Sequence, residues 1–458
     1  MIISKKKYIP LRLPIGFFLF FITFIFLLIF PDTGIISTII YLISFSIPLS
    51  YYLKRKIEVI SFFLYFYFSL NLYSLAPVLN YLTSGNPILL FHTPIAIYSE
   101  YLYLSSIINS LVIIFFGSQN NFSDRNPGIR VSKQAQLFLI TSGLILFIFQ
   151  FYATGALSIA LEGGNKGEIL TNAYKIPQTY LYFILSGVYI FTKDITRNGI
   201  RLSLTNIIIL SLILLYISFW FFINARGPII LLFIIIFFGI QRIINFKFKL
   251  SYIFLALFLY GVLAVASVSR SWKTNFNIPK TIEIIYAHPW VINVGTLEYT
   301  WGLENYVILK ENHFTQSYPL KTYSDQFISP LSRVFDFEYT TVFKEYRDKL
   351  HWKRAEKGGD YAGTGFSLLY ELVMNFGYVL FWLPILILFW WLRYIDKMFY
   401  RKNNYELYFL FLLPFCLHVG RSGLLIAPFI TKYIYSFVLA YFFNRKFWYG
   451  SKYIQVQR

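Results

Sequence analysis

Long apolar stretches alternate with short polar connections almost from one end of the chain to the other. A helix needs roughly 20 apolar residues to cross a hydrocarbon core of about 30 Å. The pattern therefore predicts an all-α integral membrane protein with about twelve transmembrane helices. The expected spans are 13–30, 35–53, 59–79, 95–116, 137–158, 177–193, 203–224, 227–241, 250–269, 366–392, 407–420 and 424–444.

One polar interval is much longer than the others and divides the chain. Residues 1–269 hold the first nine expected transmembrane helices, residues 270–365 form the interval, and residues 366–458 hold the last three helices and a tail. The interval is predicted to be a large loop that contains short helices. Within residues 323–354, aromatic and charged residues recur at helical spacing, which predicts an amphipathic helix against the membrane surface or the bundle. The aromatic and apolar positions of this helix are Phe335, Tyr339, Phe343, Tyr346 and Leu350.

Lysine and arginine are concentrated in alternate connections, and this sets the expected orientation. Residues 31–34 and 80–94 carry no cation. Cytoplasmic connections of membrane proteins carry an excess of Lys and Arg, so both chain ends are predicted to be cytoplasmic and the 270–365 loop extracytoplasmic. The basic stretches are 5–12, 54–56, 125–133, 193–201, 242–249, 393–402 and 445–458.

The composition supports the membrane class and removes several others. Apolar residues make up 57% of the 458 positions and aromatic residues 21%, with a mean hydropathy of +0.58, which excludes a soluble globular fold. The formal net charge of +20 fits attraction to anionic membrane lipid rather than to nucleic acid. Cys416 is the only cysteine, so an intrachain disulfide and a thiolate metal cluster are excluded, and no other metal-ligand spacing is present.

Three arginines stand at the expected outward ends of apolar stretches, namely Arg226, Arg270 and Arg421. An arginine at the bilayer centre costs about 2.5 to 3.5 kcal/mol, so three such charges call for a partner. Guanidinium groups bind phosphate oxygens in a bidentate manner, which predicts that the three bind an anion such as a pyrophosphate. The alternative is that each arginine extends to the lipid headgroups or pairs with a loop carboxylate.

A carboxylate and a histidine are the candidate bases. Glu371 lies about two turns into the expected tenth span, and Asn375, four residues on, shares its helix face. A carboxylate held there could accept a hydroxyl proton, or it could form a structural tie to one of the outward arginines. His418, one turn before Arg421, is the rival base because imidazole titrates near neutral pH, unless it is a packing residue.

Aromatic residues of the long loop are interleaved with acids and amides. Such rings could stack on the faces of sugars, and the alternative is an aromatic belt at the membrane interface. They are Trp272, Trp290, Trp301, Tyr318, Tyr323 and Trp352.

Four short motifs follow one another along nearly the whole chain: Asn224-Ala225-Arg226-Gly227-Pro228, Ser269-Arg270-Ser271-Trp272-Lys273, Gly363-Thr364-Gly365-Phe366-Ser367 through Glu371 to Asn375-Phe376-Gly377, and Gly420-Arg421-Ser422-Gly423. Their order, with the large outer loop between the second and the third, resembles the Wzy class of O-antigen and oligosaccharide repeat unit polymerases. These are membrane glycosyltransferases related to the GT-C group.

The resemblance implies glycosyl transfer between undecaprenyl pyrophosphate-linked oligosaccharides on the outer side of a bacterial cytoplasmic membrane, which builds a surface polysaccharide such as O-antigen lipopolysaccharide or capsule. It implies lipid-linked substrates as partners and is compatible with a separate co-polymerase that sets chain length. Glu371 or His418 would lie near the acceptor hydroxyl. No metal or other cofactor is expected, because cations of the chain would neutralise the leaving group. Those cations would be Arg226, Arg270, Lys273 and Arg421.

Two other activities remain open. An O-antigen ligase shares the topology and the leaving group, and ligases resemble one another in carrying a loop histidine, for which His288 and His313 are available. A flippase for the same lipid-linked oligosaccharide would bind the anion in a basic cavity. Such transporters are expected to show an internal repeat and short loops, and this chain shows neither.

Overall fold

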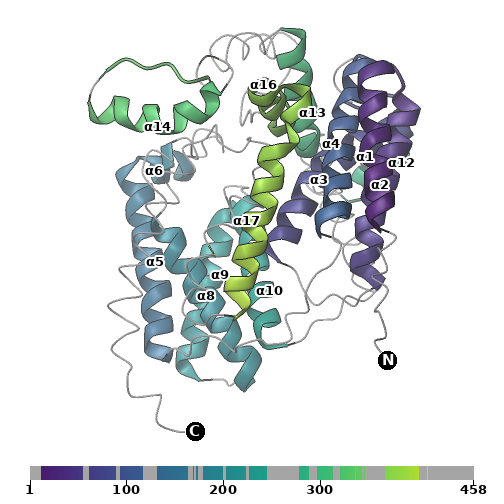
Figure 1. Ribbon diagram of the computed structural model, residues 1–458. Helices are drawn as coiled ribbons and strands as arrows, with labels where there is room; N and C mark the ends of the chain where they lie inside the picture. Colours follow the sequence, from purple (N-terminus) through teal and green to yellow (C-terminus); the bar gives the residue numbers. More distant parts are fainter. Residues whose placement is uncertain are drawn as a thin grey trace, which may run out of the picture.

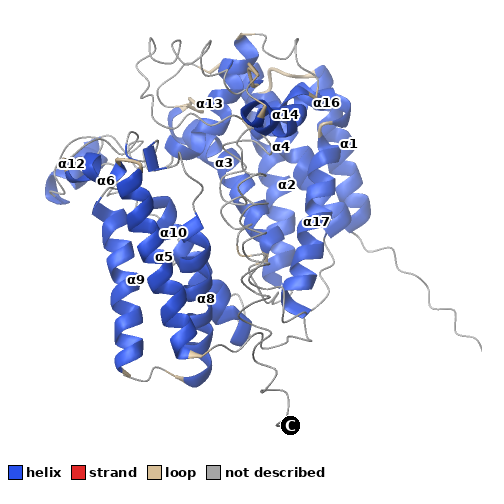
Figure 2. Ribbon diagram, turned by 90° about the vertical axis from the view of Figure 1, so that its left-hand side faces the viewer, coloured by secondary structure: helices blue, strands red, loops and turns tan. Residues whose placement is uncertain are grey.

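In a computed structural model of the chain, every regular element of the described residues is an α-helix, as the all-α prediction expects (Figure 2). The described residues are 12–54, 61–88, 93–116, 132–162, 169, 172–173, 179–199, 203–222, 226–244, 278–287, 297–312, 320–335, 337–342, 345, 367–401 and 410. The helices are α1 (Arg12–Ile29), α2 (Gly34–Lys54), α3 (Phe62–Ser84), α4 (Ile95–Phe116), α5 (Lys133–Ala153), α6 (Ala156–Leu161), α8 (Thr179–Asn198), α9 (Leu204–Phe222), α10 (Arg226–Ile243), α12 (Ile278–Ala287), α13 (Leu297–Glu311), α14 (Lys321–Val334), α16 (Leu368–Leu380) and α17 (Trp382–Arg401).

The long helices form two groups that stand side by side (Figures 1 and 2). Helices α1 to α4 pack with α13, α16 and α17 in the first bundle, and α5, α6, α8, α9 and α10 form the second bundle. Small residues bring helix backbones together in the second bundle. A Cβ atom on Gly143 of α5 would lie 2.6 Å from Ile184 Cγ1, and one on Gly187 of α8 would lie 2.5 Å from Ile140 Cγ1. This close approach is typical of helix pairs in membranes.

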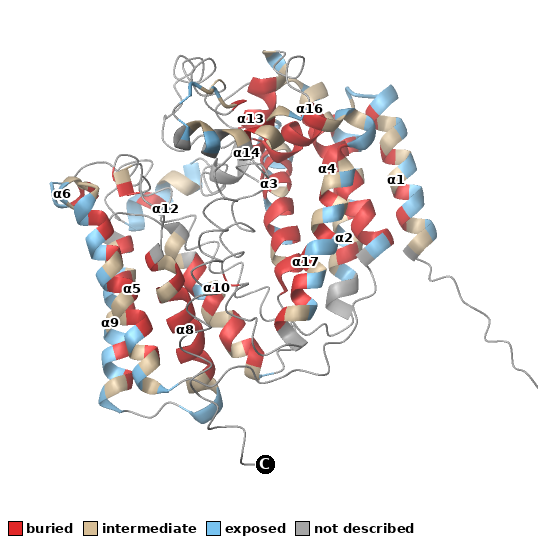
Figure 3. Ribbon diagram, turned by 60° about the vertical axis from the view of Figure 1, so that its left-hand side comes forward, coloured by how far each residue is buried: buried red, intermediate tan, exposed pale blue. Residues whose placement is uncertain are grey.

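The two ends of the molecule differ in character. Helices α6, α13, α14 and α16 gather at one end, which we call the capped end (Figures 1 and 3). At the opposite end, Lys133 Nζ lies 2.5 Å from Asp194 Oδ2, and Arg242 Nη1 donates to the carbonyl oxygen of Phe399 at 2.7 Å. Because Lys133 at the start of α5 and Arg242 in the last turn of α10 both lie there, we call it the basic end.

The two bundles meet at the basic end around Phe399 of α17. Its ring centroid lies 5.3 Å from that of Phe62 in α3 and 5.9 Å from that of Phe238 in α10. The guanidinium carbon of Arg242 lies 5.5 Å from the same ring centroid. The contacts come from α3, α10 and α17, so this one aromatic residue links both bundles.

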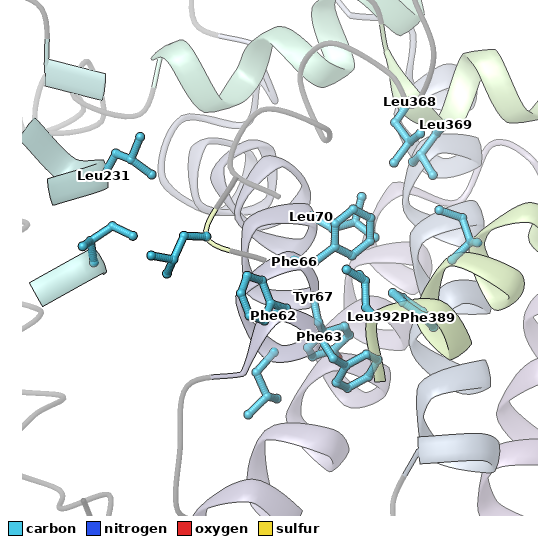
Figure 4. Close-up of a cluster of buried hydrophobic side chains, with 14 of the residues drawn as sticks. Phe62, Phe63, Phe66, Tyr67, Leu70, Leu231, Leu368, Leu369, Phe389 and Leu392 are labelled. Atoms are coloured by element: carbon cyan, nitrogen blue, oxygen red, sulfur yellow. The ribbon is translucent and has the colours of Figure 1, made fainter. Parts of the chain in front are cut away.

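Helix α3 begins at the basic end under a carboxylate supplied by α17. The two side-chain oxygens of Asp396 accept hydrogen bonds from the backbone N–H groups of Phe62 at 2.7 Å and Phe63 at 3.2 Å. A carboxylate at this position satisfies free amides and complements the positive end of the helix dipole. The ring of Phe63 then packs on Phe389, with a centroid distance of 5.2 Å, in the core between the two helices (Figure 4).

Several helices have the length and surface of membrane spans. Among the described residues, α3, α4 and α5 are long and apolar enough to cross a membrane, and α16 with α17 gives a fourth candidate if this bent pair is one span. Shorter apolar helices are Leu13–Ile29, Gly34–Ser50, Leu204–Trp220 and Leu231–Ile243. Large apolar side chains also remain exposed along the bundles, as expected where lipid replaces water: Phe18, Phe21, Ile35, Ile145, Phe149, Leu214, Leu215 and Trp390. These features indicate a multi-pass membrane protein.

The predicted helix bounds agree closely with the structure for five helices, whereas α3, α5 and α8 differ from the predicted spans 59–79, 137–158 and 177–193 by up to five residues at an end. Helices α1, α2, α4, α9 and α10 begin and end within two residues of the predicted spans. The expected spans 250–269 and 424–444 lie outside the described residues, as does 407–420 apart from Leu410. The number of twelve therefore stays a prediction.

The predicted amphipathic helix over 323–354 is wrong in extent. Helix α14 ends at Val334, and residues 337–341 are not helical. Inside α14, Asp325 Oδ1 accepts a hydrogen bond from the Tyr339 hydroxyl and Oδ2 accepts one from the Val342 N–H, both at 2.6 Å. Because both donors follow the end of the helix, the chain has to turn back at Phe335 to reach this carboxylate. Periodicity along the sequence does not reveal such a return.

Candidate functional site

A sharp bend between two helices at the capped end determines where the candidate base Glu371 lies. The predicted span 366–392 is not one continuous helix, because α16 and α17 are two helices bent by 109° at a short break. Gly377 lies at the break with φ 65° and ψ 177°, a conformation that is essentially confined to glycine. Helix α16 is therefore a short helix turned away from α17, and it carries Glu371 in its first turn. Broken helices of this kind mark ligand sites in many membrane proteins.

Three polar residues form a row at the start of α16. Ser367 is the N-cap residue, with an extended backbone, and its carbonyl oxygen accepts a hydrogen bond from the Glu371 N–H at 2.9 Å. Glu371 and Asn375, four residues apart within the helix, share one face of it. All three are buried, and Glu371 is 0% exposed. Asn375 Nδ2 donates to the Glu371 carbonyl oxygen and to Thr322 Oγ1, both at 2.7 Å. The second of these bonds joins the polar row to α14.

Helix α14 faces the polar row with its first turn. Thr322 is buried against Asn375, and the ring of Tyr323 packs edge to face on Phe376 with a centroid distance of 5.3 Å. Burial and the negative charge of Glu371 raise the pKa of the Tyr323 phenol. The phenol therefore stays protonated at physiological pH and is a hydrogen-bond donor beside the carboxylate.

A second carboxylate ties α16 to the rest of the capped end. Glu100 Oε1, near the start of α4, accepts hydrogen bonds from the hydroxyls of Tyr306 in α13 and Tyr378 in α16. Lys310 Nζ, in α13, lies 2.8 Å from the same oxygen and also donates to the Tyr378 hydroxyl. The Glu100 side chain is 13% exposed and that of Lys310 32%, so the group lies at the edge of the bundle. We call these four residues the Glu100 cluster.

Glu100→Ala is expected to lower the free energy of unfolding by about 2 to 3 kcal/mol, because it leaves a cation and two phenols without their shared acceptor. Glu100→Gln keeps an acceptor oxygen and removes only the charge, so about half of that loss is expected. The apparent Tm of the detergent-solubilised protein measures both variants. An Ala variant as stable as wild type would show that the Glu100 cluster does not hold the capped end together.

The structure describes two of the predicted site residues and leaves the other four outside the described residues. Glu371 is placed at the capped end, as above, and Arg226 is the first residue of α10. Since Arg242 in the last turn of α10 lies at the basic end, Arg226 begins the helix on the side of the capped end. The remaining predicted residues lie outside the described residues, so their distances from Glu371 stay open: Arg270, Lys273, His418 and Arg421. Among the described residues, no group of three or more His, Cys, Asp or Glu side chains could hold a metal ion.

The Glu100 cluster and the contact of α14 with α16 were not predicted from the sequence as parts of a site. Of the first turn of α14, only Tyr323 was predicted, as one of the loop aromatic residues that could stack on sugars. One signal was present, because Glu100 is the only charged residue in the expected span 95–116, and an ionisable residue inside a span is a functional-site candidate. Its three donors lie more than 200 residues further along the chain. No local pattern could have identified them.

Comparison with known proteins yields no relative. No protein-family model, no curated protein and no solved structure matches the chain. The functional assignment therefore rests on the residues and on the geometry of the capped end.

Proposed function

We propose that this chain is a membrane glycosyltransferase that polymerises undecaprenyl pyrophosphate-linked oligosaccharide repeat units into a surface polysaccharide. The observation that carries the proposal is the buried Glu371 on the short helix α16, facing the first turn of α14. The short motifs that resemble the Wzy class, of which one runs through Glu371 to Gly377, support the same activity.

The proposed setting is the bacterial cytoplasmic membrane, crossed twelve times, with both chain ends in the cytoplasm. The capped end then faces outward and holds the 270–365 loop, to which α12, α13 and α14 belong. The cations of the basic end support this orientation, because Lys133, Arg242 and Arg393 would lie on the cytoplasmic side.

In the proposed reaction, Glu371 accepts the proton of a hydroxyl group on the terminal sugar of the acceptor. The hydroxyl oxygen attacks the anomeric carbon of the donor, a new glycosidic bond forms, and the bond from that carbon to the pyrophosphate oxygen breaks. Undecaprenyl pyrophosphate leaves with the electron pair of the broken bond. Fixed cations neutralise its charge: Arg226, Arg270, Lys273 and Arg421. His418 is the rival for the role of base.

A lipid-linked oligosaccharide flippase is the second candidate. The break between α16 and α17 favours it, because discontinuous helices line the binding sites of secondary transporters. A flippase would need the cations that bind the pyrophosphate but no proton acceptor beside a sugar hydroxyl. The two candidates therefore differ in the role of Glu371.

The deciding experiment is the glycan profile of a strain that lacks this gene, complemented with wild type or with Arg421→Ala. We expect single lipid-linked repeat units on the outer face without the gene, and a polymer ladder with wild type. Arg421→Ala should lose most of the ladder, because one cation fewer stabilises the leaving group.

Two other results would contradict the polymerase, and a third would change its proposed site. Full-length polymer left on the lipid carrier would indicate an O-antigen ligase. Repeat units retained on the cytoplasmic face would indicate the flippase. An unchanged ladder with Arg421→Ala would remove that arginine from the site.

A further inference from the structure

The joint between α14 and α16 holds polar atoms whose hydrogen-bonding capacity is not used within the described chain. Ser367 Oγ, Asn375 Oδ1 and Tyr323 Oη are all buried and have no hydrogen-bond partner among the described residues. Ser367 is 1% exposed and Asn375 is 7% exposed. Buried polar groups are almost always paired, so an unpaired group needs an explanation such as a bound ligand.

These three atoms belong to one place. Ser367 caps the start of α16 one turn before Glu371, and Asn375 lies one turn after Glu371 on its helix face. The ring of Tyr323 contacts Phe376, the residue after Asn375, and the charge of Glu371 contributes to the raised pKa of the Tyr323 phenol. Other buried atoms without partners occur in the described residues, for example on Asn80, Ser186 and Trp220, but these lie on α3, α8 and α9. The joint between α14 and α16 differs from these positions because the buried carboxylate of Glu371 lies among its unpaired atoms.

The chemistry of the group indicates a neutral, hydroxyl-rich ligand. A sugar hydroxyl both donates and accepts, and here Asn375 Oδ1 can only accept, Tyr323 can donate, and Ser367 can do either. An anion such as the pyrophosphate would be repelled by Glu371. Successive residues of the row are about 6 Å apart along the helix, so the row is long enough to meet more than one hydroxyl.

We propose that Ser367, Asn375 and Tyr323 form the subsite that binds the hydroxyl groups of the acceptor glycan and holds one of them against Glu371. This inference rests on the proposed polymerase, and it names the surface that binds its acceptor. The pyrophosphate of the donor then binds elsewhere, at the cations. The neutral acceptor glycan therefore binds beside a carboxylate, and the anionic pyrophosphate of the donor binds beside cations.

Two substitutions remove the unused hydroxyls without removing any hydrogen bond to a described residue. Ser367→Ala and Tyr323→Phe are tested in the full chain reconstituted in lipid nanodiscs. The probe is the repeat oligosaccharide released by mild acid from the lipid-linked units that the deletion strain accumulates. Its Kd is taken from the rise in Tm on titration, and KM is measured with the intact lipid-linked unit.

We expect each substitution to raise the Kd and the KM about tenfold, because one hydrogen bond to the sugar is lost. The Tm of the ligand-free protein should not fall, because no internal bond is broken. Tyr370→Phe is the matched control on the same helix. Its hydroxyl already donates to the Leu309 carbonyl oxygen at 2.9 Å, so the variant should lose stability and keep its Kd and KM.

The following results would overturn the acceptor subsite or separate it from the polymerase assignment. Unchanged Kd and KM in both variants would overturn the subsite whether or not the protein polymerises. A lower ligand-free Tm in Ser367→Ala and Tyr323→Phe would also overturn it, because these hydroxyls would then have internal partners. If wild type binds the oligosaccharide through these residues but makes no polymer, the subsite stands and the polymerase assignment fails.

Discussion

Glu371→Gln is expected to reduce the rate of polymer formation by about 10² to 10⁴-fold, which is the usual contribution of a positioned general base. Glutamine has nearly the same shape and keeps an acceptor oxygen, but it cannot take the proton of the acceptor hydroxyl. Binding of the released oligosaccharide should therefore change much less than kcat. The measurement is the initial rate of ladder formation by purified protein supplied with lipid-linked repeat units.

Glu304→Gln is the matched control for this prediction. Glu304 is also a buried glutamate of the capped end, 5% exposed on α13, but it lies on a different helix from the polar row. We expect it to keep its rate within a few-fold of wild type. A Glu371→Gln variant with normal kcat would exclude Glu371 as the base and transfer that role to His418. A Glu371→Gln variant that forms no polymer but still moves repeat units across the membrane normally would show that Glu371 does not serve a flippase activity.

Gly377→Ala is expected to disturb both stability and activity through the backbone alone. A Cβ atom at this position would have no heavy atom within 4 Å, so no clash interferes. The backbone conformation, φ 65° and ψ 177°, is disfavoured for every residue with a side chain and costs about 1 to 3 kcal/mol. The chain can relieve this strain by straightening the break, which moves Glu371 away from α14. A displacement of about 1 Å is enough to lower the rate on the order of 10²-fold.

Gly85 provides the comparison for Gly377. It caps α3 at φ 73° and ψ −3°, in the left-handed helical region, and a Cβ atom there would also meet no neighbour. Asparagine tolerates that region but not the conformation of Gly377. Gly85→Asn should therefore be nearly neutral in Tm and rate, whereas Gly377→Asn should behave like Gly377→Ala. Equal behaviour of the two Asn variants would show that the break does not depend on glycine.

The sequence pattern accounts for the features that depend on near neighbours in the chain. The bounds of α1, α2, α4, α9 and α10 follow from the lengths of the apolar stretches, because a helix in lipid satisfies its backbone within its own segment. The spacing of four residues between Glu371 and Asn375 likewise predicts that the two share one helix face, and they do. The predicted sidedness rests on the same kind of local information, the distribution of lysine and arginine.

Only the tertiary structure revealed how these elements meet. A glycine within an apolar stretch is common in membrane helices, so the presence of Gly377 does not predict a bend of 109°. The end of α14 at Val334 depends on the return of Tyr339 and Val342 to Asp325, which overrides the helical periodicity that continues beyond it. The contact of Thr322 with Asn375 joins residues 53 positions apart.

Sequence alone thus determined the membrane class of the protein, the bounds of several long helices and the helix face that Glu371 shares with Asn375, because these depend on local periodicity and on the transfer of side chains between water and lipid. The tertiary structure decided that Glu371 lies on a broken helix and that α14 faces it. It also decided that Glu100 anchors α13 and α16 from a distant part of the chain. Such contacts depend on which helices pack together, and no pattern of neighbouring residues carries that information.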